Sequence, residues 1–353
     1  LASGRYKETK EVFSDNKRFV SSRGVGIQDF KLEKPWRPPS LVLEVDPPEH
    51  TKNRRFLTRA LSPNKISQLK DFFKDCADKL IRELSQKKEI DGISDLAEIF
   101  PTRVFPEAVG LKKIDKETLL GYGAMVFNAL GPDNEFRKDA MSKGLSVLEK
   151  INKQCLEENI EADGLAKEIY RSTAENSEED QLAGMLVRSL LSAGIDTTVS
   201  AIGNLLWCLA ENPEQFQLVK NDKSLVGNAV EESLRLTSPV KAFCRTSATD
   251  TEVSGVVIEE GTKILCVLGS ANTDPEVWEN SYKYDVTRRT IGHLALGVGV
   301  HNCVGQTLAR AEITALASSL TELVKKIKLV GKPTWKPNNA MRSLATLPII
   351  LET

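Results

Sequence analysis

The chain has 353 residues, of which 41% are hydrophobic and 27% are charged, so it can bury a substantial core. Its 48 lysines and arginines balance 49 acidic residues, which excludes a global field that would attract nucleic acid or an anionic membrane. The six cysteines are widely spaced without a CxxC pair, which favours a reduced, cytoplasmic protein over a disulfide framework or a structural zinc site. No apolar run reaches membrane-spanning length without a charge, so we expect no membrane segment.

The N-terminal two thirds of the chain is dominated by helical periodicity. The chain starts at Leu1 inside what we interpret as an ongoing element, so we expect an N-terminal segment to be missing. Ser62 and Pro63 form an N-cap and N1 pair, which predicts a helix that continues to residue 86. Residues 179–211 form the longest helical pattern, and this pattern is apolar on most sides. The few polar residues inside it, which include Arg188 and Asp196, therefore require a structural partner or a function.

The C-terminal third contains the strand signals. Residues 252–268 read as a pair of strands that turns at residues 259–261. A helix is predicted for residues 304–326, and residues 344–351 read as extended. Because neither internal repeats nor low-complexity linkers interrupt the chain, we expect one mainly α domain with a small β portion over residues 1–353.

Between the strand pair and the last helix, residues 294–306 read LALGVGVHNCVGQ, which crowds three glycines around one thiol. A phosphate loop is excluded because the G-x-G-x-x-G pattern is incomplete. Zinc would need three or four ligands, and only His293, His301 and Cys303 cluster here. A third interpretation fits better: glycines leave a bare surface, and a helix N-terminus stabilises the thiolate of Cys303. A thiolate on a bare, flat surface is suited to ligating haem iron.

At these residues the sequence resembles the cytochrome P450 family, across essentially the whole chain. The family signature F-G-x-G-x-H-x-C-x-G matches here with one departure, Leu296 in place of the aromatic, which affects redox tuning rather than ligation. Glu232 and Arg235 resemble the family's E-x-x-R pair, and Arg288 resembles its third partner. The resemblance implies the cytochrome P450 fold and a haem b group.

The resemblance also assigns site residues. Haem propionates need cations, and matching positions supply them from three segments of the chain. The residues that match the family's cofactor-binding positions are Cys303 as the metal ligand together with His50, Arg54, Ala193, Gly194, Arg245, His301 and Gly305.

Two residues on the long helix match the family's catalytic pair. Thr197 would hydrogen-bond reduced dioxygen at the haem, and Asp196 would relay protons from solvent. A purely structural threonine that bonds the carbonyl one turn earlier is the alternative for Thr197. The acid–alcohol pair favours electrons from NAD(P)H over hydrogen peroxide as the oxidant.

A carboxylate receptor is predicted at the far end of the same helix. Ser189 precedes Asp196 by two turns, about 10 Å along the axis, and Arg188 is its neighbour. A second pair, Arg37 and Ser40, is held by two intervening prolines. Guanidinium and hydroxyl groups directed into an apolar cavity would bind a carboxylate. Several stretches also resemble bacterial P450s that oxidise para-substituted benzoates, notably 4-methoxybenzoate O-demethylases, and the positions that match their ring-lining residues are Phe127 and Leu130.

These observations predict a monooxygenase that hydroxylates or O-demethylates a para-substituted aromatic carboxylic acid. The expected partners are O2 and a [2Fe-2S] ferredoxin with its NAD(P)H-dependent reductase, and the protein is expected to be a monomer. Two alternatives stay open: a P450 for another small acid or neutral aromatic, and a haem-thiolate sensor without turnover. The Asp196–Thr197 pair favours the enzyme, because a sensor has no use for timed proton delivery.

Overall fold

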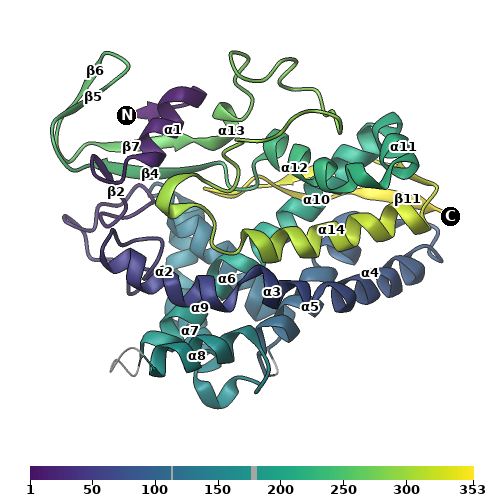
Figure 1. Cartoon of the computed structure of the whole chain (residues 1–353), viewed down its shortest axis with the longest axis horizontal. Helices are drawn as coiled ribbons and strands as arrows, with labels where there is room; N and C mark the ends of the chain where they lie inside the picture. Colours follow the sequence, from purple (N-terminus) through teal and green to yellow (C-terminus); the bar gives the residue numbers. More distant parts are fainter. Residues whose placement is uncertain (113, 176–180) are drawn as a thin grey trace.

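The computed structural model describes residues 1–112, 114–175 and 181–353, and it confirms a mainly helical chain with small sheets (Figure 1). The short η elements are Gly92–Ala97, Glu157–Asn159, Lys223–Leu225 and Gly299–His301. The α-helices are α1 (Tyr6–Ser14), α2 (Glu49–Ala60), α3 (Pro63–Ser67), α4 (Lys70–Leu84), α5 (Ile99–Val109), α6 (Lys116–Ala129), α7 (Glu135–Gln154), α8 (Leu165–Ala174), α9 (Leu182–Gly194), α10 (Asp196–Glu211), α11 (Pro213–Asn221), α12 (Val226–Thr237), α13 (Leu268–Ala271) and α14 (Gln306–Leu323).

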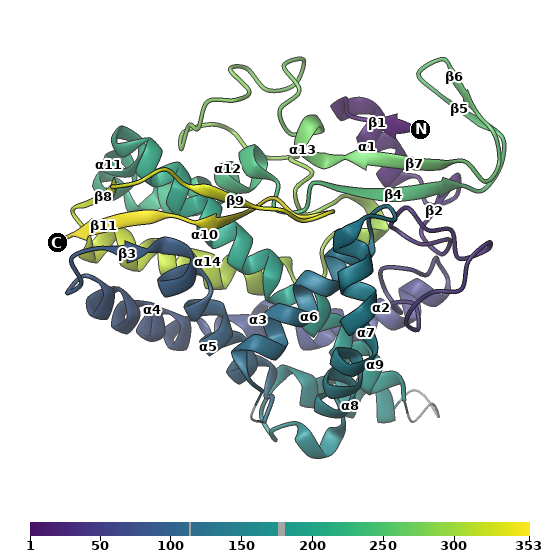
Figure 2. The same ribbon diagram turned by 180° about the vertical axis from the view of Figure 1, so that it is seen from behind.

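The strands form small sheets at one side of the helical body (Figures 1 and 2). One sheet has the order β1-β7-β4-β2, another the order β3-β11-β8, and two further pairs are β10-β9 and β5-β6. The strands are β1 (Ala2–Ser3), β2 (Phe19–Val20), β3 (Ile90–Asp91), β4 (Ala242–Ser247), β5 (Thr251–Val253), β6 (Val256–Ile258), β7 (Lys263–Val267), β8 (Lys326–Leu329), β9 (Thr334–Lys336), β10 (Ser343–Thr346) and β11 (Pro348–Glu352).

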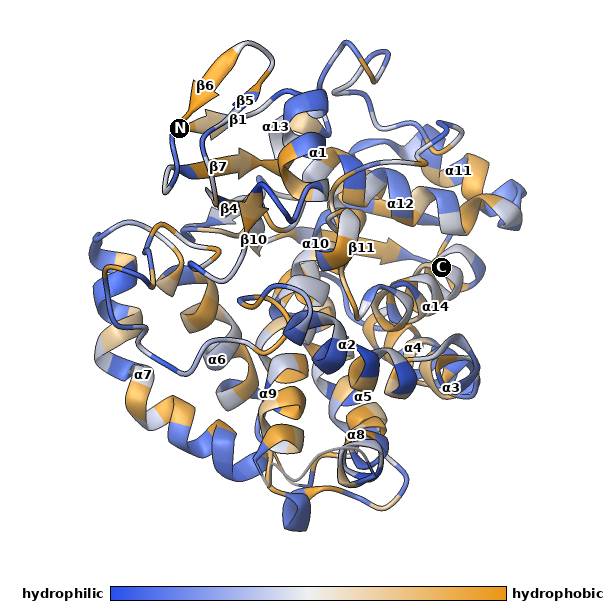
Figure 3. Cartoon of the chain, turned by 60° about the vertical axis from the view of Figure 1, so that its left-hand side comes forward, coloured by the Kyte–Doolittle hydropathy of each residue, from blue (hydrophilic) through white to orange (hydrophobic). Residues whose placement is uncertain are grey.

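The long apolar pattern forms the centre of the molecule, but as two helices. Helix α9 ends at Gly194 and α10 begins at Asp196, with Ile195 between them. Helix α10 packs against α12, α14, β8 and β10, and this all-round contact explains why it is apolar on most sides. Apolar residues dominate α9 as well, whereas polar residues dominate α2 at the surface (Figure 3). The predicted start at residues 179 and 180 lies outside the described residues.

Taken together, Leu182–Glu211 is long and apolar enough to cross a membrane by length and composition. However, 61% of its most apolar window is buried inside the protein, as expected for a core helix.

Three sequence predictions need correction. The helix expected over residues 63–86 is divided into α3 and α4 by a turn at Gln68–Leu69. The strand pair turns at Ser254–Gly255, where both residues have positive φ, and β7 pairs with β4 instead of with β6. The last helix begins at Gln306, two residues later than predicted. The extended C-terminal stretch is confirmed as β10 and β11.

A buried ionic network joins α12 to the loop that precedes the cysteine segment. The Arg235 guanidinium donates to both Glu232 oxygens at 2.7 and 2.9 Å, and Arg288 Nε donates to Glu232 Oε1 at 2.9 Å. Arg235 also donates to the carbonyl oxygens of Asn272 and Ser281. The Glu232 and Arg235 side chains are fully buried, so this is no solvated helix pair. Its hydrogen bonds compensate the cost of burying the charges.

Candidate active site

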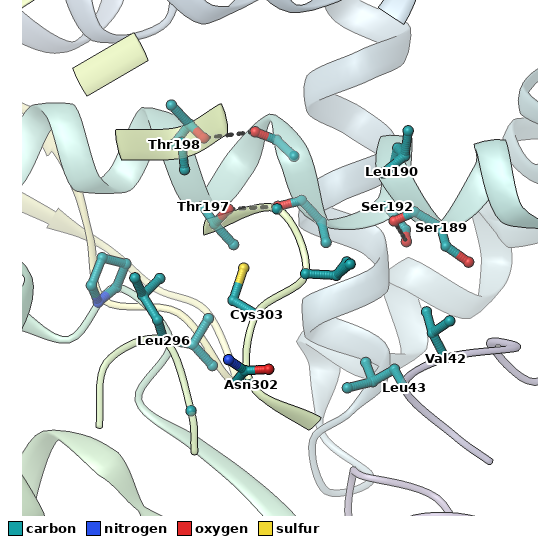
Figure 4. Close-up of a pocket in the computed structure, with 18 of the residues that line it drawn as sticks. Val42, Leu43, Ser189, Leu190, Ser192, Thr197, Thr198, Leu296, Asn302 and Cys303 are labelled. Carbon is teal, nitrogen blue, oxygen red and sulfur yellow. Dashed lines mark hydrogen bonds between the residues drawn. The ribbon is translucent and has the colours of Figure 1, made fainter. Parts of the chain in front are cut away.

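A cavity lies between α9, α10, α14 and the cysteine loop, and the space of about 1720 Å³ that no protein atom fills there includes its opening to solvent. Its walls are mostly apolar. Figure 4 shows the sulfur of Cys303 directed toward the α10 turn that carries Thr197, with Ser189 on the side opposite Leu296. The predicted residues that line the cavity are Arg37, Ser40, Arg54, Phe127, Leu130, Ser189, Ala193, Gly194, Thr197, Arg245, His301, Cys303 and Gly305.

The cysteine loop is closed by backbone contacts and by a close approach to α1. The Cys303 N–H donates to the Leu296 carbonyl oxygen at 2.7 Å. Gly299 has φ +74°, and a Cβ there would lie 3.1 Å from the Phe13 carbonyl oxygen, so only glycine fits without a shift. A Cβ on Gly305 would lie 4.0 Å from the sulfur. Its absence keeps the surface beside the thiol open, as the sequence predicted.

The pKa of the Cys303 thiol is set by opposing effects, only one of which the sequence predicted. Burial raises the pKa of Cys303, and the Gly305 N–H and the Arg54 guanidinium oppose that effect. The thiolate expected from the helix N-terminus therefore also needs the positive charge of a bound metal ion. The rival thiols Cys244 and Cys266 are buried in β4 and β7, and burial raises their pKa values. Neither of them lines the cavity.

Four basic side chains gather at one side of the cavity: Arg54, Arg245 and His301 line it, whereas His50 does not line it and packs with its ring centroid 4.3 Å from that of His301. Both nitrogens of His50, which is 1% exposed, lack hydrogen bonds within the described chain, as does His301 Nε2. Arg245 is buried over the Phe13 ring and donates to the Cys244 carbonyl oxygen. Arg54 donates to Asn302 Oδ1 at 2.5 Å.

These orphaned groups constitute a test of the expected cofactor. Burial lowers the pKa of His50 to about 4, and His301 and Arg54 nearby act in the same direction. Buried polar atoms without partners require a ligand or water, and the guanidinium groups of Arg54 and Arg245 require an anion. Two carboxylates of one flat group beside Cys303 would satisfy them, so the residues present fit haem. Among the described residues no group of three or more metal-binding side chains offers an alternative metal site.

Asp46 supplies the nearest acid to this cluster. Its carboxylate lies 3.7 Å from His301 Nε2 and accepts hydrogen bonds from the backbone N–H groups of Ser21 and Ser22. Burial acts to raise the pKa of Asp46, but the nearby His301 and the hydrogen bonds from Ser22 and Ser21 outweigh it and lower the pKa. The single carboxylate of Asp46, which also binds the backbone, does not balance the charges of Arg54 and Arg245, so this group of side chains stays positive.

Thr197 and Asp196 occupy the first turn of α10 and face different ways. The Thr197 hydroxyl lines the cavity and donates to the Ala193 carbonyl oxygen at 2.5 Å, which is the structural alternative raised by the sequence. Its lone pairs remain able to accept. Asp196 does not line the cavity; it packs on Gly123 of α6, where a Cβ would lie 2.7 Å from the Asp196 Cβ. Burial raises the pKa of Asp196 to about 6, opposed by Lys336 and assisted by Glu98.

Gly194 has a packing reason that the sequence did not reveal. A Cβ there would lie 2.3 Å from the Phe105 ring, so the absence of a side chain is required by α5. Gly194 also lines the cavity, together with Ala193. The contact with Phe105 and the open cavity therefore both require a residue without a side chain at the junction of α9 and α10.

The polar end of the cavity differs from the predicted receptor in one respect. Arg37 Nη1 lies 3.1 Å from Glu44 Oε2, and both side chains are buried, so Arg37 already has a carboxylate partner. Ser40 Oγ accepts from the Leu43 N–H, which leaves its hydrogen free to donate. Ser189 donates to the Met185 carbonyl oxygen. Arg188 lies behind the cavity wall, is 5% exposed, and pairs with no carboxylate among the described residues.

Several contributors were not found from the sequence. Glu44 pairs with Arg37, Asn302 pairs with Arg54, and Phe243 joins the apolar wall with Phe127. Glu44 and Asn302 have no periodic signal, although each stands within four residues of a predicted site residue. Proximity in the sequence was therefore the only available indication.

Comparison with known proteins gives a consistent result. The family model for Cytochrome P450 matches residues 122–348. The chain is 45% identical to Cytochrome p450 CYP199A2 of Rhodopseudomonas palustris over 98% of this chain and 84% of that protein. It is 30% identical to Cytochrome P450 107B1 of Saccharopolyspora erythraea over 87% of this chain and 76% of that protein.

Solved structures show the same fold. P450BioI in complex with an acyl carrier protein ligated to hexadec-9Z-enoic acid has a TM-score of 0.88 at 23% identity, covering 99% of this chain and 92% of that one. Cytochrome P450 CREJ in complex with (4-ethylphenyl) dihydrogen phosphate has a TM-score of 0.88 at 24% identity, covering 100% and 92%.

Proposed function

This chain belongs to the cytochrome P450 family and is a haem-binding monooxygenase, and we propose that it oxidises a para-substituted aromatic carboxylic acid such as 4-methoxybenzoate. Members of the family use O2 and electrons from a redox partner. The proposed partner here is a [2Fe-2S] ferredoxin with an NAD(P)H-dependent reductase, and the proposed reactions are hydroxylation and O-demethylation. We also propose that the protein is monomeric and cytoplasmic and that residues 1–353 form one domain.

The observation that carries the substrate class is the uncompensated charge at the polar end of the cavity. Arg37 and Arg188 are both buried, and only Arg37 has a carboxylate partner within the described chain. Two hydroxyl groups, from Ser40 and Ser189, lie on the cavity wall beside them. A buried, unpaired guanidinium is costly, and a ligand carboxylate would relieve that cost. The apolar wall between this end and Cys303, with Phe127 and Leu130, suits an aromatic ring.

The chain's own residues would divide the work as follows. Cys303 would ligate the iron, and His50, Arg54, Arg245 and His301 would bind the two carboxylates of the cofactor, the arginines as cations and the histidines as N–H donors. When bound, haem supplies the capacity to activate dioxygen. Thr197, whose hydroxyl hydrogen is donated to the Ala193 carbonyl oxygen, would present its lone pairs to the reaction space.

Asp196 would hold the proton that this space consumes. A pKa of about 6 lets the carboxyl group both carry and release a proton near neutral pH. Because Asp196 does not line the cavity and the charges of Lys336 and Glu98 act on it, we propose that it would exchange that proton with the protein surface.

A ligand panel tests the substrate class. We expect 4-methoxybenzoate to shift the haem spectrum at concentrations roughly ten- to a hundredfold below those needed for methoxybenzene, because the neutral ligand leaves a buried cation and hydroxyls unpaired. Moving the methoxy group to the ortho position should prevent oxidation, since the anchored ring then directs it away from the reacting centre. Equal affinity for the acid and its neutral analogue would overturn the aromatic-acid proposal and favour a neutral substrate.

A further inference from the structure

Two neighbouring guanidinium groups lie at the polar end of the cavity, Arg37 on its wall and Arg188 behind that wall. Arg37 Nη1 donates to the Pro38 carbonyl oxygen at 2.9 Å, and Arg188 Nη2 donates to the same oxygen at 3.3 Å. The two cations therefore share one acceptor and lie next to each other. Burial lowers the pKa of Arg188, and the charge of Arg37 acts in the same direction. The buried hydroxyl of Tyr122 has no hydrogen-bond partner in the described chain and lies in the field of both cations.

One internal carboxylate is bound to this pair of cations. Glu44 Oε2 lies 3.1 Å from Arg37 Nη1 and accepts a hydrogen bond from the Ser40 N–H at 2.8 Å. The Glu44 side chain is 3% exposed. Within the described residues no second carboxylate pairs with Arg37 or Arg188. Two cations and one anion leave this buried cluster with a single positive charge.

We propose that Glu44 determines the charge of the acid that this enzyme accepts, so that the site selects ligands with one negative charge. The inference rests on the proposed function and adds a specificity-determining residue to it. A monoanion completes a set of two guanidinium groups and two carboxylates, which is neutral. A dianion leaves an excess negative charge in a buried site, and a neutral ligand leaves the positive charge unpaired. Both mismatches are costly where the dielectric constant is low.

Glu44 also supports the loop that carries Arg37 and Ser40. Its carboxylate pairs with the Arg37 side chain and accepts a hydrogen bond from the Ser40 backbone N–H. A substitution could therefore weaken binding through lost support alone. The test must separate charge from support, and a comparison of ligands with equal shape and different charge does so.

Three ligands with the same tetrahedral head group provide that comparison: neutral 4-methoxybenzenesulfonamide, monoanionic 4-methoxybenzenesulfonate and 4-methoxyphenylphosphonate above its second ionisation. Affinity is measured on the haem-loaded protein from the spectral shift and from the ligand-dependent rise in unfolding temperature. For the unmodified protein we expect the sulfonate to bind about tenfold or more tightly than either of the others. This result does not depend on any variant folding.

Glu44→Gln keeps an oxygen that can accept from Ser40 and Arg37 but removes the charge. We expect the ratio of phosphonate to sulfonate affinity to rise about tenfold or more in this variant. The double variant Glu44→Gln/Arg188→Gln restores a single positive charge and should recover the preference for the sulfonate. Glu33→Gln, an exposed acid on the same N-terminal segment, serves as the matched control and should leave the ratio unchanged.

The outcomes separate the two proposals. If the unmodified protein binds the sulfonamide as tightly as the sulfonate, the acid-binding function itself fails. Should it bind the sulfonate and the phosphonate equally, the acid-binding function survives and the role of Glu44 is refuted. A Glu44→Gln variant that loses the same factor of affinity for all three ligands would reduce Glu44 to a support for the loop and overturn the inference.

Discussion

Two buried ionic regions of this molecule look alike in composition but differ in how their charges are satisfied. Around Glu232, two guanidinium groups share one carboxylate, and the remaining donors of Arg235 reach backbone carbonyl oxygens. Around the cavity, Arg54, Arg245 and two histidines converge without an anion to match their number. The first region is complete in the protein alone, whereas the second becomes complete only when an anion enters.

The difference separates a structural role from a binding role. A polar group that is buried and fully paired contributes to a unique fold, and its removal leaves its partners unpaired. A buried cation without a partner destabilises the protein that carries it, so its presence indicates a ligand. The five predictions that follow test this distinction, from the largest expected effect to the smallest.

The largest effect is expected at Cys303, the thiol that the unpaired cations surround. Cys303→Ser should abolish the absorption band that is typical of thiolate-ligated haem when the reduced protein binds carbon monoxide. Cys244→Ser, which changes a buried thiol outside the cavity, should retain the band. A band that persists in the Cys303 variant would contradict the assignment of the ligand.

Glu232→Gln should break the complete region. The variant leaves Arg235 and Arg288 with an amide in place of a shared carboxylate, and the expected loss is about 3–5 kcal/mol in the free energy of unfolding. Urea denaturation with and without haem measures it. Glu231→Gln, at the neighbouring and more exposed acid, should lose less. Equal losses in the free energy of unfolding for the two variants would mean that the buried network stabilises the fold no more than the exposed pair does.

Arg245→Leu should have opposite effects with and without haem. Removing an unmatched buried cation should leave the haem-free protein as stable as before or up to about 1–4 kcal/mol more stable. The loaded protein should release haem about tenfold faster or more, which transfer to apomyoglobin would measure. Arg55→Leu, at the exposed position next to Arg54, is the control. A variant that is destabilised both with and without haem would show that Arg245 stabilises the fold, as the residues around Glu232 do.

Asp196→Asn should stabilise the protein in a pH-dependent way. Burial raises the folded-state pKa from 3.8 to about 6, so the unmodified protein loses stability as pH rises through this window, and the loss is complete above it. The variant should therefore be about 1–3 kcal/mol more stable above pH 6 and equally stable below 3.8. Turnover should fall by at least about a hundredfold. A stability difference that is independent of pH would exclude the proposed titration.

Leu296→Phe should give the smallest effect, because it restores an aromatic beside the thiol without changing any charge. The haem potential should shift while haem content and unfolding temperature stay the same, and spectroelectrochemistry would measure the shift. Leu296 lines the cavity and already accepts the Cys303 N–H through its carbonyl oxygen, so the backbone contact is preserved. An unchanged potential would make this position a packing site only.

The sequence allowed much of the site to be predicted, because ligands that bind a metal or an anion need particular residue types at fixed spacing. Cys303 with its glycines and the pair Glu232–Arg235 were identified by such patterns, and the structure places each where its pattern required. Arg37 and Arg188 were predicted chiefly from the resemblance, and the structure places Arg37 on the cavity wall and Arg188 behind it.

The sequence by itself determined the mainly helical class and the cysteine loop, since these depend on periodicity and on local residue chemistry. The resemblance supplied the other site residues, of which His50, Arg188 and Asp196 do not line the cavity. Only the tertiary structure decided which partner each charge has. Arg37 meets Glu44 because the turn at residues 41–43, closed by the Glu44 N–H donating to the Ser40 carbonyl oxygen, brings them together, and Arg188 joins them from α9. Likewise Gly194 is required by Phe105 of a helix far away in the chain, and α9 and α10 separate at Ile195. Such pairings depend on contacts between distant segments, which residue spacing along one chain does not encode.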